Sequence, residues 1–172
     1  DLDRRLTRQR LTVEARVLGR LQNMGFPSPS LYDLDVKEGW ILLSRIDGRP
    51  LCEALRDGSA GLTAVKSTGA LIRRLHEEGF SHGDMTTHNI LIDASGSLSV
   101  IDFGLARISP ELEHMGLDLQ VLNECLTASH SELEGAVEAM VEGYLRDGGS
   151  EFEASDVVSR FDAIRGRVRY HG

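Results

Sequence analysis

The chain has 172 residues, 41% of them hydrophobic, which suits one globular domain or one domain with part of a second. It shows no apolar run long enough to span a membrane, and its formal net charge of −8 argues against a protein coated in nucleic acid, although a local basic patch remains compatible. Cys52 and Cys125 lack C-x-x-C spacing, so we expect reduced cysteines in a cytoplasmic protein with no membrane partner.

The first predicted element is a helix over residues 7–24. Apolar residues recur at helical spacing along it: Leu11, Ala15, Leu18 and Leu21. Glu14 falls within this stripe, and two interpretations are open. Its carboxylate either reaches solvent from the edge of the stripe, or is the helix carboxylate that pairs with a phosphate-binding lysine in kinases.

Two short strands, residues 31–36 and 40–44, flank a Lys-Glu-Gly turn and predict a hairpin. The segment 46–50 contains Gly48 and Pro50, which interrupt regular structure, and it is the best boundary between a small first part, 1–46, and a larger second part, 47–172. Two helices are then expected, over 51–55 and 61–78.

Residues 82–104 carry two polar clusters. The stretch H-G-D-M-T-T-H-N places His82, Asp84 and Asn89 at the fixed positions of a kinase catalytic loop, and residues 102–104 match its D-F-G turn. A hairpin of 90–92 with 98–101 lies between the clusters and would bring them side by side.

These residue types suit phosphoryl transfer, which needs Mg²⁺ to neutralise phosphate charge and one carboxylate to orient the attacking group. Asp102 and Asn89 offer the hard oxygen ligands that Mg²⁺ prefers, and Asp84 is the candidate base. Each residue type alone is also common in turns, so the prediction depends on the combination.

The rest of the chain predicts helices over 117–128 and 133–145, then a last helix around residues 157–164. Arginines cluster at its end: Arg160, Arg165, Arg167 and Arg169. They form either a solvated helix end or a contact with phosphate or RNA. The histidines outside residues 82–89 show no metal-ligand spacing, so zinc is not expected.

Four stretches resemble the small atypical serine/threonine kinases of the KEOPS complex, the PRPK or Bud-type family. H-G-D-M-T-T-H-N (82–89) is similar to that family's H-G-D-L-T-T-x-N. L-D-L-Q-V-L-N-E-C-L-T-A-S-H (117–130) and D-A-I-R-G-R-V-R (162–169) look like its C-terminal segments. L-T-R-Q-R-L-T-V-E-A-R (6–16) resembles its R-x-x-x-E-A-R helix and favours the lysine-pairing interpretation of Glu14.

The resemblance implies an α+β, protein-kinase-like two-lobed fold, with residues 1–46 as a partial N-lobe and 47–172 as a reduced, mostly helical C-lobe. It implies ATP and Mg²⁺ as cofactors, Leu91 as the floor of the adenine pocket, and the backbone from Ser44 to Ile46 against the adenine edge.

Members of the family are serine/threonine kinases and ATPases that support threonylcarbamoyladenosine modification of tRNA. The resemblance therefore implies a Kae-type threonylcarbamoyl transferase and a Cgi-type KEOPS subunit as partners. It also implies that the tail arginines Arg165, Arg167 and Arg169 contact tRNA or a partner.

Some family features differ. No Gly-rich loop or V-A-I-K-like strand precedes Leu6, so we expect an N-terminally truncated chain that binds ATP weakly by itself. His88 replaces the usual Ser, and Thr86 stands where ordinary protein kinases place a Lys. The alternatives are an aminoglycoside-type small-molecule phosphotransferase and a non-catalytic scaffold fragment.

Overall fold

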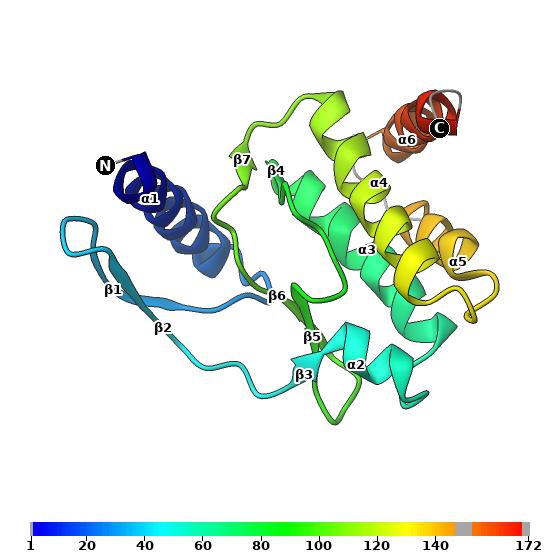
Figure 1. The fold of residues 1–172 in the computed structure, drawn as a ribbon, viewed down its shortest axis with the longest axis horizontal. Helices are drawn as coiled ribbons and strands as arrows, with labels where there is room; N and C mark the ends of the chain where they lie inside the picture. Colours follow the sequence, from blue (N-terminus) through cyan, green and yellow to red (C-terminus); the bar gives the residue numbers. More distant parts are fainter. Residues whose placement is uncertain (1, 147–152, 170–172) are drawn as a thin grey trace.

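The computed structural model describes residues 2–146 and 153–169. Figure 1 shows a long helix, α1 (Leu2–Asn23), beside an antiparallel hairpin of β1 (Leu31–Asp35) and β2 (Trp40–Leu43), with a helical body on the other side. Within the described residues, no helix has the length and apolar character needed to cross a membrane.

The body follows in the order β3 (Arg49–Pro50), α2 (Leu51–Arg56), α3 (Leu62–Glu77), β4 (Phe80–Ser81), β5 (Ile90–Ile92), β6 (Leu98–Val100), β7 (Arg107–Ile108), α4 (Leu112–Ser129), α5 (Ala136–Tyr144) and α6 (Ala154–Arg169). All the predicted helices form, and so do both predicted hairpins. The body is mostly helical and the first part is small, which agrees with the predicted α+β class.

One extended core joins both parts of the molecule. Val17, Leu18 and Leu21 of α1 are fully buried and belong to the same cluster as the apolar residues of α3, α4 and α5. Leu11 is only half-buried, so the buried face of α1 is rotated slightly from the predicted stripe. Burial of these side chains contributes roughly 1.5–3 kcal/mol each.

Helices α3 and α5 cross at very close range because glycines face the crossing. A Cβ atom added at Gly69 would overlap the carbonyl oxygen of Met140, and one added at Gly143 would overlap that of Lys66. Two glycines, one on each helix, therefore let the two backbones touch. This contact holds α3 firmly behind the segment that carries the polar clusters.

Three short strands pair in the order β3-β5-β6, with Arg49 opposite Ile92 and Ile90 opposite Val100. The predicted linker 46–50 is thus partly a strand. Pro50 is tolerated because β3 lies at the edge of this sheet, where one face of the backbone needs no partner. The Val100 N–H donates to the Pro27 carbonyl at 2.9 Å, which ties the sheet to the segment after α1.

Helix α4 begins at Leu112 rather than at the predicted Leu117. The Glu111 side chain accepts a hydrogen bond from the main chain of the first turn, and the His114 ring accepts one from the Glu111 N–H. This reciprocal cap adds a turn that the apolar pattern did not indicate, because Glu is not a typical N-cap residue.

Candidate active site

The β5-β6 hairpin brings the two polar clusters together, and the His82 ring connects them. Its Nε2–H donates to the Ile101 carbonyl at 3.0 Å, while Nδ1 accepts the Asp84 N–H at 3.2 Å. The ring lies 5.1 Å from that of Phe103. The Ile101 N–H also donates to the Asn89 carbonyl at 2.9 Å. The predicted neighbourhood of the catalytic loop and the D-F-G turn is confirmed.

Asp84 and Asn89 contact each other directly. The Asn89 Nδ2 donates to the Asp84 carbonyl at 2.9 Å and to its Oδ2 at 3.1 Å. Because the amide nitrogen is engaged in this way, the amide oxygen of Asn89 points elsewhere and remains an acceptor. Both side chains are half-buried, so they are accessible from the site but held by the loop.

Asp102 adopts a left-handed backbone conformation, with φ at 62°. Among residues other than glycine, Asp tolerates this region better than most, and such conformations concentrate at functional sites. The Asp102 side chain is exposed, and its Oδ1 lies 3.4 Å from the Gly104 N–H that donates to it. The turn therefore presents a carboxylate outward while burying Phe103 completely.

Glu14 reaches this turn from α1, 89 positions earlier in the chain. Its Oε1 accepts the Phe103 N–H at 3.3 Å. Burial raises the pKa of the Glu14 carboxyl, and the negative charge of Asp102 raises it further. Glu14 is thus half-buried against the D-F-G turn rather than directed to solvent, and two carboxylates face one region.

The donors around Asn89 and Asp102 fit a magnesium ion held jointly with phosphate. They are an amide oxygen and a carboxylate, both hard ligands. In the described part of the chain, no group of three or more His, Cys, Asp or Glu side chains is placed to hold a metal alone. A cation here would therefore take its remaining ligands from a nucleotide and water, as Mg²⁺ commonly does.

The residues expected around adenine lie on the segment after β2 and on β5. The Ser44 N–H donates to the Ser30 carbonyl at 2.9 Å, and its hydroxyl accepts the Ser30 N–H at 2.8 Å. Of the Ser44 main chain, the carbonyl oxygen is therefore the group left to contact a base. Ile46 and Leu91 are half-buried, and Leu91 lies opposite Pro50 and Ser99 in the sheet.

Asp118 on α4 is a site residue that we did not predict. Its Oδ2 accepts the His82 N–H at 2.7 Å and its Oδ1 accepts the Gly83 N–H at 2.8 Å. Asp118 is buried and fixes the main chain just before Asp84. Gly83 has φ at 83°, a conformation that glycine allows, and a Cβ there would overlap the Leu105 carbonyl.

His76 and Tyr144 extend this buried network. The His76 Nε2 lies 3.0 Å from Asp118 Oδ2, and its Nδ1 lies 2.7 Å from the Tyr144 hydroxyl. Because a carboxylate can only accept, the His76 Nε2–H donates to Asp118. Burial, with the Asp118 charge, raises the pKa of Tyr144 far above its ordinary value. Sequence spacing could not reveal these partners, because 42 and 68 positions separate them from His76.

The arginines of the predicted basic tail lie on α6 and contact the protein itself. The Arg165 guanidinium lies 5.6 Å from the centre of the Phe161 ring, and Arg167 pairs with Glu113 at 3.1 Å. The side chain of Arg169 lies outside the described residues. Both described arginines therefore have intramolecular contacts that a ligand would have to replace or share.

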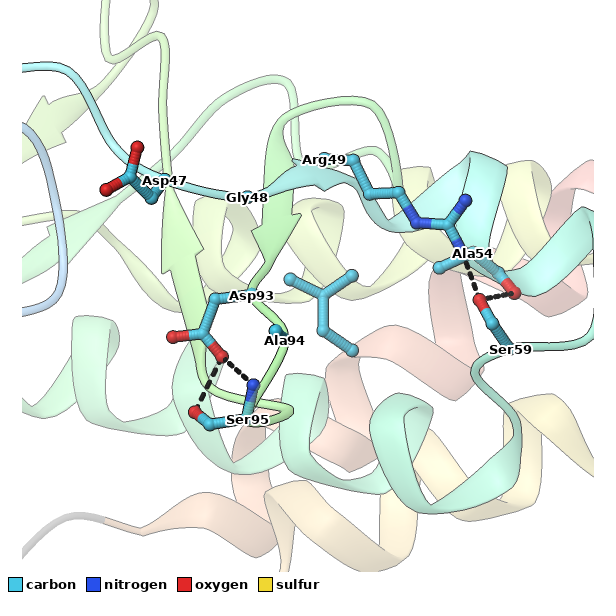
Figure 2. A pocket seen from close by; sticks show the side chains of 9 residues that line it. Asp47, Gly48, Arg49, Ala54, Ser59, Asp93, Ala94 and Ser95 are labelled. Atoms are coloured by element: carbon cyan, nitrogen blue, oxygen red, sulfur yellow. Dashed lines mark hydrogen bonds between the residues drawn. The ribbon is translucent and has the colours of Figure 1, made fainter.

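A separate cavity of about 760 Å³ lies between the Asp47–Arg49 segment, Ser59 and the β5-β6 loop (Figure 2). Several of its polar side chains are engaged: Arg49 contacts Ser59 and, outside the lining, Asp57 at 2.6 Å, while Asp93 accepts the Ser95 hydroxyl at 2.6 Å. None of the proposed catalytic or metal-binding side chains lines it. Its size alone does not make it the reaction site.

Comparisons with known proteins point in one direction. Residues 52–135 match the lipopolysaccharide kinase (Kdo/WaaP) family model. The chain is 36% identical to the "Probable serine/threonine-protein kinase BUD32 homolog" of Archaeoglobus fulgidus, over 99% of this chain and 81% of the relative. It is 31% identical to the "KEOPS complex subunit Bud32" of Pyrococcus abyssi, over 99% of this chain and 78% of the relative.

Longer relatives match as well. The chain is 34% identical to the "Probable bifunctional tRNA threonylcarbamoyladenosine biosynthesis protein" of Methanosarcina acetivorans, but it spans only 29% of that protein. Among solved structures, the bifunctional kinase-methyltransferase WbdD aligns with 94% of this chain and 36% of its own, with a TM-score of 0.58 and 20% identity. This last likeness concerns the fold alone.

Proposed function

Because the chain belongs to the Bud32 family of serine/threonine kinases, we propose that it uses Mg²⁺ and ATP to phosphorylate protein hydroxyl groups or to hydrolyse ATP in support of threonylcarbamoyladenosine formation on tRNA. The observation that carries this proposal is the contact network of residues 82–104. A candidate base, an amide oxygen and a carboxylate are held side by side by main-chain and imidazole hydrogen bonds.

In this proposal Asp84 orients the attacking hydroxyl or water, with its carboxylate directed by the Asn89 amide. Asn89 and Asp102 would hold Mg²⁺, which would supply charge neutralisation at the transferred phosphate. Asp118 acts at one remove, because it fixes the main chain that carries Asp84.

In the same proposal, the segment after β2 and strand β5 bind the nucleotide. The Ser44 carbonyl and the Ile46 backbone would face the adenine edge, with Leu91 beneath the ring. Glu14 would share a cation, whether a lysine or the metal, with Asp102, since two adjacent carboxylates are otherwise unfavourable. Residues 1–46 and 47–172 would be the two lobes that enclose the nucleotide.

The names of the relatives support partners and a process for this chain. By analogy with the KEOPS subunit and the bifunctional tRNA-modification proteins, we assign it a Kae-type threonylcarbamoyl transferase and a Cgi-type subunit as partners, with tRNA bound through the complex. Arg165, Arg167 and Arg169 are the basic residues proposed to face tRNA or a partner.

The test compares ATP turnover by the wild type with Asp84→Asn and Asp102→Asn, with and without Mg²⁺. Each substitution should lower turnover by about 10²-fold or more, since each removes a group acting in the transition state. Asp102→Asn should also raise the Mg²⁺ concentration needed for half-maximal rate. Asp162→Asn, an exposed carboxylate on α6, is the matched control and should leave turnover unchanged.

Turnover that is equal in all four proteins would contradict the enzymatic proposal and leave a scaffold. To test the tRNA role, the same variants are added to the transferase and tRNA, and threonylcarbamoyladenosine is measured. Loss of modification with Asp102→Asn, but not with Asp162→Asn, is the expected result.

A further inference from the structure

A cavity of about 290 Å³ opens beside Gly83, the residue that precedes the candidate base. Four segments enclose it: β4, the catalytic loop, the chain after the D-F-G turn, and α4. Its lining includes Ser81 and Gly83, together with the apolar side chains of Leu105, Leu117 and Val121. Whatever fills this cavity would therefore lie next to the reacting hydroxyl group.

Much of the wall is apolar, and three polar side chains complete it: Arg107, His114 and Asp118. Leu105 and Leu117 keep 46% and 41% of their surface exposed, and both face this cavity, together with the half-buried Val121. Each square ångström of such surface removed from water is worth roughly 25 cal/mol. An apolar group that covered both leucines would therefore gain binding free energy from the walls alone.

The cavity also has a buried hydroxyl group without a hydrogen-bond partner among the described residues, that of Ser81. Ser81 is 1% exposed, and its hydroxyl oxygen is one of two buried side-chain polar atoms without a partner in the described chain. The Asp118 carboxylate lines the same cavity, but both its oxygens already accept hydrogen bonds, from Gly83 and from His82 and His76. A buried hydroxyl that lacks a partner costs roughly 1–3 kcal/mol, which a ligand could recover.

From these features we propose that the cavity binds a tyrosine side chain of the protein substrate, close in sequence to the phosphorylated Ser or Thr. The proposal rests on the kinase activity proposed above. Such a side chain combines a large apolar body with a single polar tip, and it usually finds a hydrogen-bond partner for that tip when buried. Leu105 and Leu117 cover the ring, and Ser81 bonds the tip. The cavity is larger than an isolated aliphatic side chain needs.

The experiment uses serine peptides that carry Tyr, Phe or Ala at successive positions beside the acceptor. At one position the wild type should show the lowest KM with Tyr, a KM about tenfold higher with Phe, and a still higher one with Ala. The Tyr–Phe difference measures the bond to Ser81, since a buried hydrogen bond is worth roughly 1 kcal/mol or more.

Two variants test the apolar contacts and the hydrogen bond to Ser81 separately. Ser81→Ala should abolish the preference for Tyr over Phe and leave the KM for Phe unchanged. Because the hydroxyl has no partner in the free protein, this variant should be at least as stable as wild type to urea. Leu117→Ala should raise KM for both aromatic peptides. Leu62→Ala, on α3 and equally exposed at 42%, is the control and should change neither.

A Tyr–Phe preference that persists in Ser81→Ala, or equal KM values for Tyr and Ala peptides at every position, would overturn the inference. ATP turnover without peptide distinguishes this outcome from failure of the proposed function. If turnover still depends on Asp102 while the peptides are not discriminated, the kinase assignment stands and the cavity assignment falls. If turnover does not depend on Asp102, a methyl NMR titration of Leu105 and Leu117 with the Tyr peptide tests the cavity independently.

Discussion

Glu14 and Asp102 bring two carboxylates to a single turn of the backbone. Glu14 accepts the Phe103 N–H, while Asp102 stands in a left-handed conformation beside it. Burial raises the pKa of the Glu14 carboxyl, and the neighbouring charge of Asp102, which is electrostatically unfavourable in the free protein, raises it further. The site is therefore arranged for a cation to bind.

Glu14→Gln should stabilise the free protein at pH 7. The pKa of Glu14 is higher in the folded state than its ordinary value of 4.5. Protonation of Glu14 therefore stabilises the folded state fully at a pH below 4.5, and this contribution is lost as the pH rises through the folded pKa. Glutamine keeps an acceptor for the Phe103 N–H but does not ionise. Urea unfolding at several pH values should show a gain that shrinks on acidification. Glu38→Gln, exposed in the β1-β2 turn, should show no such trend.

Asp118→Asn should lower both the free energy of unfolding and the rate of ATP turnover. The carboxylate accepts two main-chain N–H groups and the His76 proton, whereas an amide would turn a donor toward at least one of them. We expect a loss of roughly 3–5 kcal/mol in unfolding free energy, typical of one partner removed from a buried charged network. Tyr144→Phe, which deletes only the hydroxyl bonded to His76, should cost about 1–2 kcal/mol. Equal stability of the two variants would argue against a central role for Asp118.

At the level of elements, the apolar patterns predicted every helix and both hairpins. Local patterns worked for these because a helix stripe or a hairpin turn is written within a few residues. They failed for β4 and β7, which are two residues long and pair only because Phe80 meets Ile108 across the fold. The N-cap of α4 was missed for a different reason, since its capping residue is an unusual one.

The candidate site was likewise predicted only in part from local sequence patterns. Asp84, Asn89 and Asp102 were found from short-range spacing, and the structure brings them together. Asp118 and His76 could not be found, because their roles arise from contacts between distant helices. His76 had no metal-ligand spacing, and nothing local distinguishes it from an ordinary surface histidine.

Gly143→Ala tests the close crossing of α3 and α5. The added methyl would overlap the Lys66 carbonyl, and neither backbone can yield without separating the helices. We expect a cost of about 3 kcal/mol, at the upper end for overpacking. Gly19→Ala in α1 is the matched control, because a Cβ there meets nothing within 4 Å and should stabilise by roughly 0.5–1 kcal/mol. Comparable effects at both positions would mean that the helices can move apart cheaply.

For the whole molecule, a net charge of −8 disfavours contact with a polyanion, so any affinity for tRNA must come from a local basic region. The described arginines of α6 are already engaged, Arg165 with Phe161 and Arg167 with Glu113. Binding would exchange these contacts for phosphate.

Arg165→Ala combined with Arg167→Ala should weaken tRNA binding, most strongly at low salt. If both side chains neutralise phosphates, the slope of log K against log salt should fall by about 1.4–1.8. Filter binding of tRNA across a salt series measures both quantities. Arg20→Ala, in the last turn of α1, is the control and should leave the slope unchanged. A loss of affinity that is independent of salt would show that the two arginines only pack.

The network behind Gly83 also sets an order of events during synthesis. The main chain beside the candidate base is held by Asp118, 36 positions after His82, and the histidine that supports it is paired with Tyr144, 68 positions after His76. A chain emerging from the ribosome thus exposes its catalytic loop well before the helices that fix it. Since domains form as units during translation, a nascent chain that ends before α4 would carry Asp84, Asn89 and Asp102 without the Asp118 carboxylate that fixes the catalytic loop.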